Sequence, residues 1–510
     1  MTNTKKKTHL WLLVLSFLLV AMRFLSPRIV PFISDEPIFQ EWAEQILQTG
    51  HWPAVCLGGS SIPISYGAGA VWLYTIPHYL FPGSLGFTLF HITQYSFGFL
   101  FLYLGLRRML CPLSAAWALL LAASSPLLFL LSRHTWDTTF FVPSTGFILL
   151  CFSHLWIPSD EGPWHWSVKR FLPLLGISFA CALCINIHLS IGPTVVAVYA
   201  TLLAWLLKLE KKNMAAWLAV FLSGTLVLLL CTPYALAGYE FMHKYPTIMA
   251  QTHYSRWGSG RHFWWNILHV FVWISTWHIN VFFEPIYDDF LQFIGFGAKS
   301  IFHLDLMGWI VKFPLILMLF WAPVSLLRKK WSKASLPLCY AAAGFFCVLL
   351  VFQYLNVPVQ PHYFHCVWWL PFLAVAIFFY RLPERYKKYY AFFVALAVLT
   401  NIVFNVGTLA YITKNGGVRG MHISTGIGET EKAVEDLCEM SKAEHLNNLR
   451  IDISRIYLGY SPIKYFIKHT KKCEGLSAGV SMQPITDAHY RMEYIDAQGP
   501  NARFHAVRVK

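Results

Sequence analysis

The distribution of apolar residues along the 510-residue chain predicts a membrane protein with many spans. Hydrophobic residues make up 56% of the chain and charged residues only 13%. Apolar runs of roughly twenty residues, enough to cross a bilayer as a helix, recur between Leu10 and Tyr411. We predict about eleven transmembrane helices on this basis. The runs are Leu10–Leu25, Gly86–Leu106, Leu113–Leu131, Thr139–Trp156, Phe171–Ile187, Ile191–Leu207, Trp217–Leu236, Leu306–Leu327, Leu336–Tyr354, Val367–Tyr380 and Ala391–Tyr411.

Basic residues predict the orientation of these spans. Lys5, Lys6 and Lys7 precede the first run, and further Lys and Arg clusters follow alternate runs. Cytoplasmic loops carry an excess of Lys and Arg, so we expect an uncleaved first span with its N-terminus in the cytoplasm. The short apolar stretch Tyr66–Phe81 is interpreted as an interfacial segment, because this choice keeps Arg107 and the following basic clusters inside. The protein is then a multi-pass protein of the cell membrane.

From Ile412 onward the chain changes character, because glycine and charged residues become frequent and no run is long enough to span a bilayer. We predict a transmembrane domain over residues 1–411 and a small extracytoplasmic α/β domain over residues 412–510. A helix is expected over Glu429–Met440. Strands are expected at Arg450–Ile453, Ser477–Ser481, Arg491–Ile495 and Ala506–Val509. Cys438 and Cys473 would pair if this compartment is oxidising.

Net charge and motifs exclude several classes of function. The charge of +15 is explained by the loops between spans, so we expect no nucleic-acid partner. The basic run Lys464–Lys472 is either a solvated face or a contact with anionic lipid or glycan. The chain contains no P-loop, HExxH, GxSxG or spaced Cys/His metal motif. We therefore expect no ATP hydrolysis, no thiol nucleophile, no cofactor and no metal.

The stretch Ser34–Glu44 places two adjacent carboxylates, Asp35 and Glu36, just outside the first span. An amphipathic helix is predicted to follow, and such a helix lies on the bilayer surface. Its apolar face is formed by Ile38, Phe39, Trp42, Ile46 and Leu47, and its polar face by Gln40, Glu41, Glu44 and Gln48. Pro37 suits a first helical turn. Asp35 is either an N-cap, a catalytic group or both.

Polar groups from several outer loops are expected to meet beside this helix. A carboxylate with cationic groups at the edge of a bilayer suits the transfer of a sugar from a lipid phosphate, because the phosphate is a good leaving group and the acceptor hydroxyl needs a base. Asp35 and Glu36 are the candidate catalytic residues. The candidate substrate-binding residues are Arg133, His134, Asp137, His188, Arg256, Arg261, His362 and Tyr363.

The order of these features resembles the GT-C glycosyltransferases of family 39, which include protein O-mannosyltransferases and lipid A aminoarabinose transferases. The acidic pair Asp35-Glu36 directly after the first span is the most specific part of the resemblance, and the helix at Trp42 and the Gly50 turn follow it. The other parts are Tyr66–Pro77, Ser132–Asp137 and His362-Tyr363 before Leu370-Pro371. The resemblance covers roughly Leu10 to Tyr411. It implies a GT-C fold and an inverting, metal-independent transferase that uses a polyprenyl-phosphate-linked sugar at the outer face, with Asp35 in the catalytic acidic position.

The chain also departs from that family. The aminoarabinose transferases carry a Glu-Lys pair before the second interfacial helix, whereas Gly58–Pro63 contains no basic residue. The donor phosphate is then held elsewhere, or the sugar donor differs; the acceptor stays open among proteins, lipids and glycans. A transporter or lipid flippase is the alternative, although the sequence shows no clear internal repeat and its ionisable residues gather at span ends. Further alternatives are a scaffold with a binding C-terminal domain and a metal-dependent oligosaccharide-transferring enzyme.

Overall fold

The structure is a computed structural model of the chain. It describes residues 3–32, 35–58, 65–155, 167–244, 287–295, 300–328, 334–355, 361–419, 425–456, 460–496 and 500–509. Side chains are not described for residues 242, 244, 300–307, 352–355, 361–363 and 460 within these ranges.

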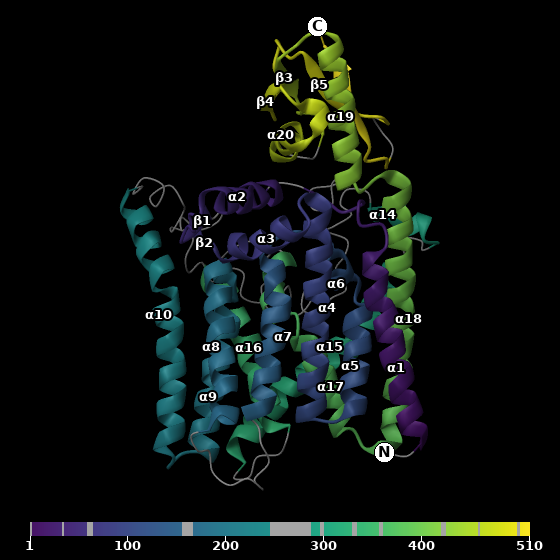
Figure 1. Ribbon diagram of the computed structural model, residues 1–510. Coiled ribbons are helices and arrows are strands. Elements are labelled where there is room, and N and C mark those ends of the chain that lie inside the picture. The colour runs from purple at the N-terminus through teal and green to yellow at the C-terminus, as the bar shows by residue number, and fades with distance from the viewer. Residues whose placement is uncertain are drawn as a thin grey trace.

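Helices standing side by side, most of them long, form the larger part of the molecule (Figure 1). They are α1 (Asn3–Ala21), α4 (Ser84–Met109), α5 (Pro112–Ser124), α6 (Pro126–Leu131), α7 (Phe141–Leu155), α8 (Val168–Ile187), α9 (Gly192–Leu209), α10 (Met214–Lys244), α15 (Ser300–Leu327), α16 (Ser335–Leu355), α17 (Leu370–Arg381) and α18 (Glu384–Asn415). Short 3-10 turns join or extend them at η1 (Met22–Phe24), η2 (Asp137–Phe140), η4 (Leu189–Ile191) and η7 (Pro361–Val367). The chain is a polytopic α-helical membrane protein.

The expected number of spans is met only when short helices are included. Within the described residues, nine helices are long and apolar enough to cross a membrane, and α5 and part of α16 are shorter apolar helices. The run predicted as one span over Leu113–Leu131 is broken at Ser125, whose backbone is extended (φ −53°, ψ 122°). Pro126 follows, and a residue before proline is disfavoured in helical geometry. The chain therefore restarts as the short helix α6.

Two helices lie across one end of the bundle instead of along it (Figure 1). They are α2 (Glu36–Thr49) and α3 (Gly69–Leu80), and their place agrees with the interfacial segments predicted from sequence. An antiparallel hairpin of β1 (Val55–Gly58) and β2 (Ser65–Gly67), which was not predicted, connects them. Gly67 is required there, because a Cβ atom would collide with the carbonyl of Asn186 at the end of α8.

The C-terminal residues form an α/β unit at the same end as α2 (Figure 1). Its sheet has the order β4-β3-β5-β6, in which β3 pairs in parallel with β4 and β5, and β5 pairs antiparallel with β6. The elements are α19 (Ile427–Ala443), β3 (Asn448–Asp452), α20 (Tyr460–His469), η8 (Lys471–Cys473), β4 (Ser477–Ser481), β5 (Tyr490–Tyr494) and β6 (Phe504–Arg508). The predicted helix and four strands are present, whereas α20 was missed.

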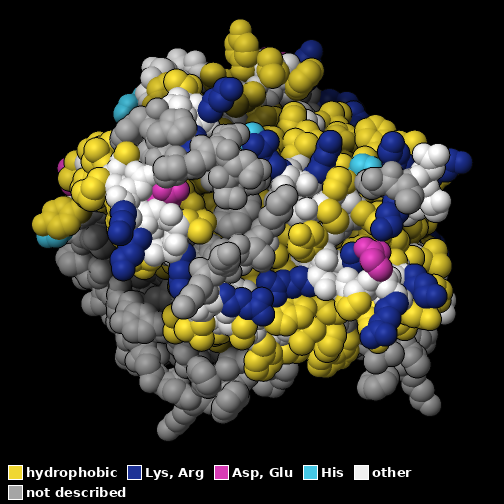
Figure 2. Space-filling view, turned by 90° about the horizontal axis from the view of Figure 1, so that it is seen from below, with side chains coloured by type: hydrophobic (Ala, Val, Ile, Leu, Met, Phe, Trp, Pro, Cys, Tyr) yellow, Lys and Arg dark blue, Asp and Glu magenta, His cyan; other side chains and the backbone are white. Residues whose placement is uncertain are grey.

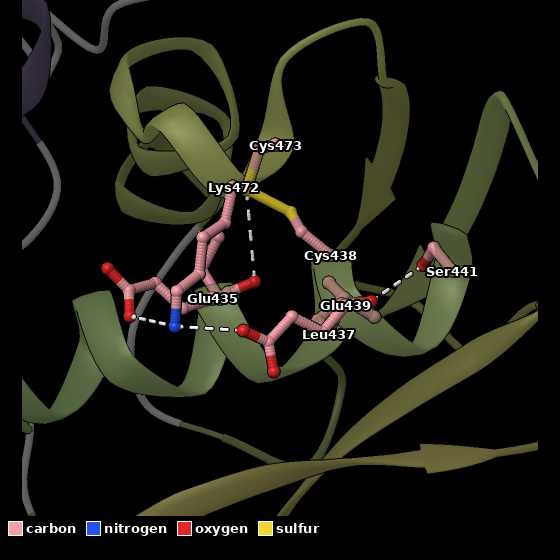
Figure 3. Close-up of a disulfide and its surroundings, with 8 residues drawn as sticks. Glu435, Leu437, Cys438, Glu439, Ser441, Lys472 and Cys473 are labelled. Carbon is pink, nitrogen blue, oxygen red and sulfur yellow. Dashed lines mark hydrogen bonds and ion pairs between the residues drawn. A yellow bond between two sulfur atoms is a disulfide. The ribbon is translucent and has the colours of Figure 1, made fainter. Parts of the chain in front are cut away.

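A disulfide and ion pairs hold α19 against the segment after α20. Cys438 and Cys473 are bonded, as expected for an oxidising compartment (Figure 3). Lys472 pairs with Glu435 at 3.0 Å and with Glu439 at 2.9 Å. Part of the predicted basic run is thus engaged within the protein.

The α/β unit is built onto the loop between α1 and α2. Phe32 is fully buried in its hydrophobic core. The backbone N–H of Ile427 donates to the carbonyl of Val30 at 2.8 Å, and that of Gly428 donates to Arg28 at 2.9 Å. Lys468 on α20 also pairs with Glu44 on α2 at 3.1 Å. The loop that leads to Asp35 is therefore shared by both parts of the molecule.

The opposite end of the bundle is rich in Lys and Arg, with few Asp or Glu side chains (Figure 2). Helices α1, α8 and α18 begin at this end, and α4 and α9 finish there (Figure 1). Exposed basic residues at these helix ends are Lys5, Lys6, Lys7, Arg107, Arg108, Lys169, Lys208, Arg385 and Lys388. This end of the bundle is thus strongly positive.

Candidate functional site

Asp35 stands at the start of α2, on the side of the bundle that carries the α/β unit. It occupies the N-cap position (φ −88°, ψ −17°), but its side chain makes no capping hydrogen bond. The residue is exposed. Gly50 ends the same helix in a left-handed conformation (φ 70°), as glycine allows. The carboxylate of Asp35 is therefore presented at the surface without serving the helix as a cap.

Glu36 is fully buried and joins the loop before α2 to the loop between α6 and α7. Its Oε1 accepts a hydrogen bond from the backbone N–H of Thr135 at 3.0 Å. The same oxygen lies 3.6 Å from Nδ1 of His134. Glu36 and Asp35, although adjacent in sequence, thus differ in environment: Glu36 ties two loops together and Asp35 faces outward.

Asp137, at the start of η2, lies near Asp35, as predicted from the sequence. The two carboxyl groups are close enough to interact electrostatically. The backbone N–H of Thr138 donates to Oδ1 of Asp137 at 2.7 Å. Tyr74 on α3 is near as well, because burial and the charges of Asp137 and Glu36 raise the pKa of its hydroxyl well above 10.0. Carboxylates from two loops therefore gather at one place.

His91 on α4 supports this loop from below. Its Nε2 lies 2.8 Å from the hydroxyl of Tyr74, which in turn donates to the carbonyl of Thr135. Its Nδ1 lies 2.6 Å from Oγ1 of Thr139 and 2.8 Å from Nε2 of Gln94. His91 is fully buried. The histidine thus contacts the loop on both sides of Asp137.

His365 in η7 supports the loop from another helix. Its Nδ1 lies 2.9 Å from Oγ1 of Thr138, and its Nε2 lies 2.7 Å from the hydroxyl of Tyr95. His365 is also buried. Residues Thr135, Thr138 and Thr139 are therefore each held by a buried polar side chain outside the loop.

Arg133 was predicted to bind substrate. In the structure its two terminal nitrogens are hydrogen-bonded to backbone carbonyl groups. Nη1 donates to the carbonyls of Arg23 and Leu25, at 2.9 and 2.8 Å, and Nη2 donates to that of Ser26 at 2.7 Å. Burial lowers the pKa of this guanidinium to about 10, so it stays charged at neutral pH. No ion pair with Asp137 is found among the residues described. Arg133 thus fixes the end of the first span.

The two predicted histidines whose side chains are described pack against aromatic rings. The ring of His134 stacks on Trp136 with centroids 4.4 Å apart. His188, between α8 and α9, packs on Tyr66 at 4.0 Å and accepts a hydrogen bond from the backbone N–H of Ser190 at 3.0 Å. Burial lowers the pKa of His188 to about 3, so this side chain is neutral at pH 7.

The other candidates are not placed. Arg256 and Arg261 lie outside the described residues. His362 and Tyr363 belong to η7, but their side chains are not described. The histidine of this segment that is seen to contact the Asp137 loop is His365.

Tyr74, His91, Tyr95 and His365 were not among the predicted site residues. A signal was present for two of them. His91, Gln94 and Tyr95 are three polar side chains at positions i, i+3 and i+4 of an apolar span, so they share one helix face. Polar residues inside a membrane segment are costly and usually contact one another or a functional site. His365 was harder to identify, because His362, three residues before it, was the histidine predicted for this segment.

Comparison with solved structures identifies the fold. The chain is similar to ArnT from Cupriavidus metallidurans in the apo state, with a TM-score of 0.56, 12% identity, and coverage of 90% of this chain and 84% of that one. It is also similar to the apo oligosaccharyltransferase of Archaeoglobus fulgidus, with a TM-score of 0.50, 12% identity, and coverage of 96% and 66%. The chain has the GT-C fold.

The fold expected from the sequence is therefore confirmed. No protein-family model matches the sequence, and no curated protein matches it.

Proposed function

We propose that this GT-C protein is a membrane glycosyltransferase that moves a sugar from a polyprenyl-phosphate carrier to an acceptor at the outer face of the cell membrane. The observation that carries the proposal is the pair Asp35 and Asp137. Carboxyl groups from two different loops lie within electrostatic range of each other at this end of the bundle, and that of Asp35 is exposed and does not cap its helix. The shared fold and the activity of the archaeal oligosaccharyltransferase support the same reaction class.

The distribution of charge and cysteine supports the proposed orientation. The end of the bundle opposite Asp35 is rich in Lys and Arg, as cytoplasmic ends are (Figure 2). The Cys438–Cys473 disulfide lies at the other end, and disulfides persist in oxidising compartments outside the cytoplasm. Both observations favour an N-terminus inside and a site that faces outward.

Asp35 is assigned the role of general base in this proposal. A lipid phosphate leaves readily, whereas an acceptor hydroxyl is a weak nucleophile until its proton is removed. The exposed carboxylate takes that proton as the hydroxyl attacks the anomeric carbon from the face opposite the phosphate, so the reaction inverts the configuration. Asp137, held beside it, accepts hydrogen bonds from sugar or acceptor hydroxyl groups. The chemistry requires no metal ion, because the leaving group is already activated.

The cation that neutralises the departing phosphate is assigned to the outer segment that carries Arg256 and Arg261. The terminal nitrogens of Arg133 are hydrogen-bonded to backbone carbonyl groups, and His188 is neutral at pH 7. Neither side chain is therefore assigned to the departing phosphate. Oriented cations stabilise charge that develops on a phosphate as its bond to the sugar breaks.

Transfer from a panel of labelled polyprenyl-phosphate sugars by the purified protein tests the proposal. Replacement of Asp35 by Asn should lower kcat by about 10²- to 10⁴-fold, the usual contribution of a general base. The matched control is Glu41→Gln, which removes a carboxylate from the same helix and should leave transfer nearly unchanged. Donor binding should persist in the Asp35→Asn variant.

Other outcomes would select other functions. Full activity of the Asp35→Asn variant would remove Asp35 as the base. Activity abolished by a chelator and restored by a divalent ion would favour a metal-dependent oligosaccharide-transferring enzyme. Movement of labelled lipid between leaflets without sugar transfer would favour a flippase.

A further inference from the structure

We infer that His91 and His365 are positioning residues that hold the Asp137 carboxylate beside Asp35. This inference rests on the proposed function, in which Asp137 binds hydroxyl groups of a substrate. Three threonines flank Asp137 in the short segment from Thr135 to Thr139, and none of these residues lies in a long regular helix. Such a segment needs outside support to keep one carboxylate in place.

The hydrogen bond from Tyr74 to Thr135 indicates the tautomer of the His91 ring. The hydroxyl of Tyr74 donates its one proton to the carbonyl of Thr135, so its oxygen accepts from Nε2 of His91, 2.8 Å away. Nε2 therefore carries the proton of the neutral ring, and Nδ1 is the acceptor that faces Nε2 of Gln94 and Oγ1 of Thr139. His91 on α4 is thus linked to the loop through Tyr74 on α3.

His365 makes a second, independent connection. Its two ring nitrogens bridge the hydroxyls of Thr138 and Tyr95. Tyr95 lies on the same helix as His91, one turn further along. Both histidines therefore connect the loop to α4. His91 contacts it through Tyr74 before Asp137 and directly at Thr139 after it, and His365 contacts it at Thr138.

Glu36 completes the arrangement on the opposite side. Its carboxylate accepts a hydrogen bond from the N–H of Thr135, and the carbonyl of Thr135 accepts one from Tyr74. The backbone of this one residue is therefore held by both α2 and α3. The loop is thus fastened from α2, α3, α4 and η7. Because precise placement of a binding group determines how well it contacts its substrate, loss of one fastening should weaken substrate binding before it affects the fold.

The experiment compares His91→Phe, which keeps a ring of similar shape, with His91→Gln, which keeps a donor and an acceptor. Hydrogen exchange of the peptide covering Thr135–Phe140 is measured in the purified full-length protein. Exchange should rise about tenfold in His91→Phe, the effect of one or two hydrogen bonds, and return toward the wild-type rate in His91→Gln. His365→Phe should give a similar increase.

The control is His9→Phe. His9 on α1 also contacts a tyrosine of α4, Tyr103, at 2.9 Å, but it lies near the other end of that helix. Exchange in the Thr135–Phe140 peptide should be unchanged in this variant. Unchanged exchange in both His91→Phe and His365→Phe would overturn the inference.

Kinetics provide the second measurement. In the transfer assay, with a donor that the protein accepts, His91→Phe should raise KM about tenfold with a smaller change in kcat. Adding Tyr74→Phe to this variant should change KM little further, because both substitutions break the same chain of hydrogen bonds. A loss confined to kcat, or strict additivity, would contradict a positioning role. If the protein transfers no sugar at all, the proposed function fails while the exchange result still decides whether the histidines hold the loop.

Discussion

The ring of Phe32 meets that of Tyr465 edge to face, with centroids 5.2 Å apart and an angle of 69° between their planes. Phe32 comes three residues before Asp35, whereas Tyr465 lies in α20 of the C-terminal unit. Phe466 contacts the same ring at 5.5 Å. The backbone that presents the proposed base is therefore anchored in a core built from the last hundred residues of the chain.

Replacing Phe32 by Ala should loosen this core. Removal of a fully buried phenyl ring costs about 3–5 kcal/mol in the free energy of unfolding, so hydrogen exchange in β3 and α20 should become about 10²- to 10⁴-fold faster. Sugar transfer should fall as well, since Asp35 loses its anchor. Met482→Ala, at a position that is 59% exposed in the same unit, is the control and should change neither.

Substitutions at Glu36 separate a structural role from a catalytic one. Glu36→Gln keeps an oxygen that accepts the N–H of Thr135, so we expect transfer within about threefold of wild type. Glu36→Leu leaves that buried N–H without an acceptor and should lower stability by about 1–3 kcal/mol, measured as a fall in thermal midpoint. If Glu36→Gln instead loses as much activity as Asp35→Asn, Glu36 takes part in the chemistry.

The disulfide should stabilise the C-terminal unit. Cys438 and Cys473 are 35 residues apart, and closing a loop of such length typically contributes about 2–4 kcal/mol. The double variant Cys438→Ser, Cys473→Ser should therefore be cleaved faster by a protease within residues 425–509. A reducing agent should accelerate cleavage of the wild type and have no effect on the double variant. An equal effect on both would show that the bond does not contribute.

His188 predicts a loss of stability in mild acid. Its pKa is about 3 in the folded protein because of burial, against 6.5 as the ordinary value. Between these values the unfolded chain binds one more proton than the folded protein, so stability falls as the pH drops below 6.5. From pH 6.5 to pH 5 the loss is about 2 kcal/mol.

The measurement is the thermal midpoint of wild type and His188→Gln at several pH values. The wild type should lose more of its stability than the variant between pH 6.5 and pH 5, although the variant starts lower because it loses the contact with Tyr66. Parallel curves would mean that His188 is protonated without penalty in the folded state.

Much of the architecture follows from the sequence because membrane spans depend on local composition. Runs of apolar residues placed the long helices, and the amphipathic pattern after Asp35 placed α2 across the end of the bundle. The break in the run at Leu113–Leu131 was missed, although Ser125-Pro126 marks it. The helix α20 was missed as well, because its basic residues suggested a solvated segment and not a helix packed on α2 and α19.

The site was harder to predict, because it depends on contacts between distant segments. Asp35, Glu36 and Asp137 were expected to meet, and the structure brings them together. Their roles stay predictions. The supports at His91 and His365 are separated from the loop by many residues in sequence. Arg133, predicted to bind substrate, is hydrogen-bonded to carbonyl groups at the end of the first span, a contact that its sequence position did not indicate.

The hydrogen bonds from Ile427 and Gly428 to the loop at Arg28–Val30 have a consequence for biosynthesis. A ribosome makes residues 28–30 about four hundred residues before Ile427 and Gly428, and the described helices α1 to α18 lie before those two partners. The loop can form these hydrogen bonds only after that later segment has been made. The backbone before Asp35 should therefore take its final shape late in synthesis, and a chain that stops before residue 427 should lack this anchor.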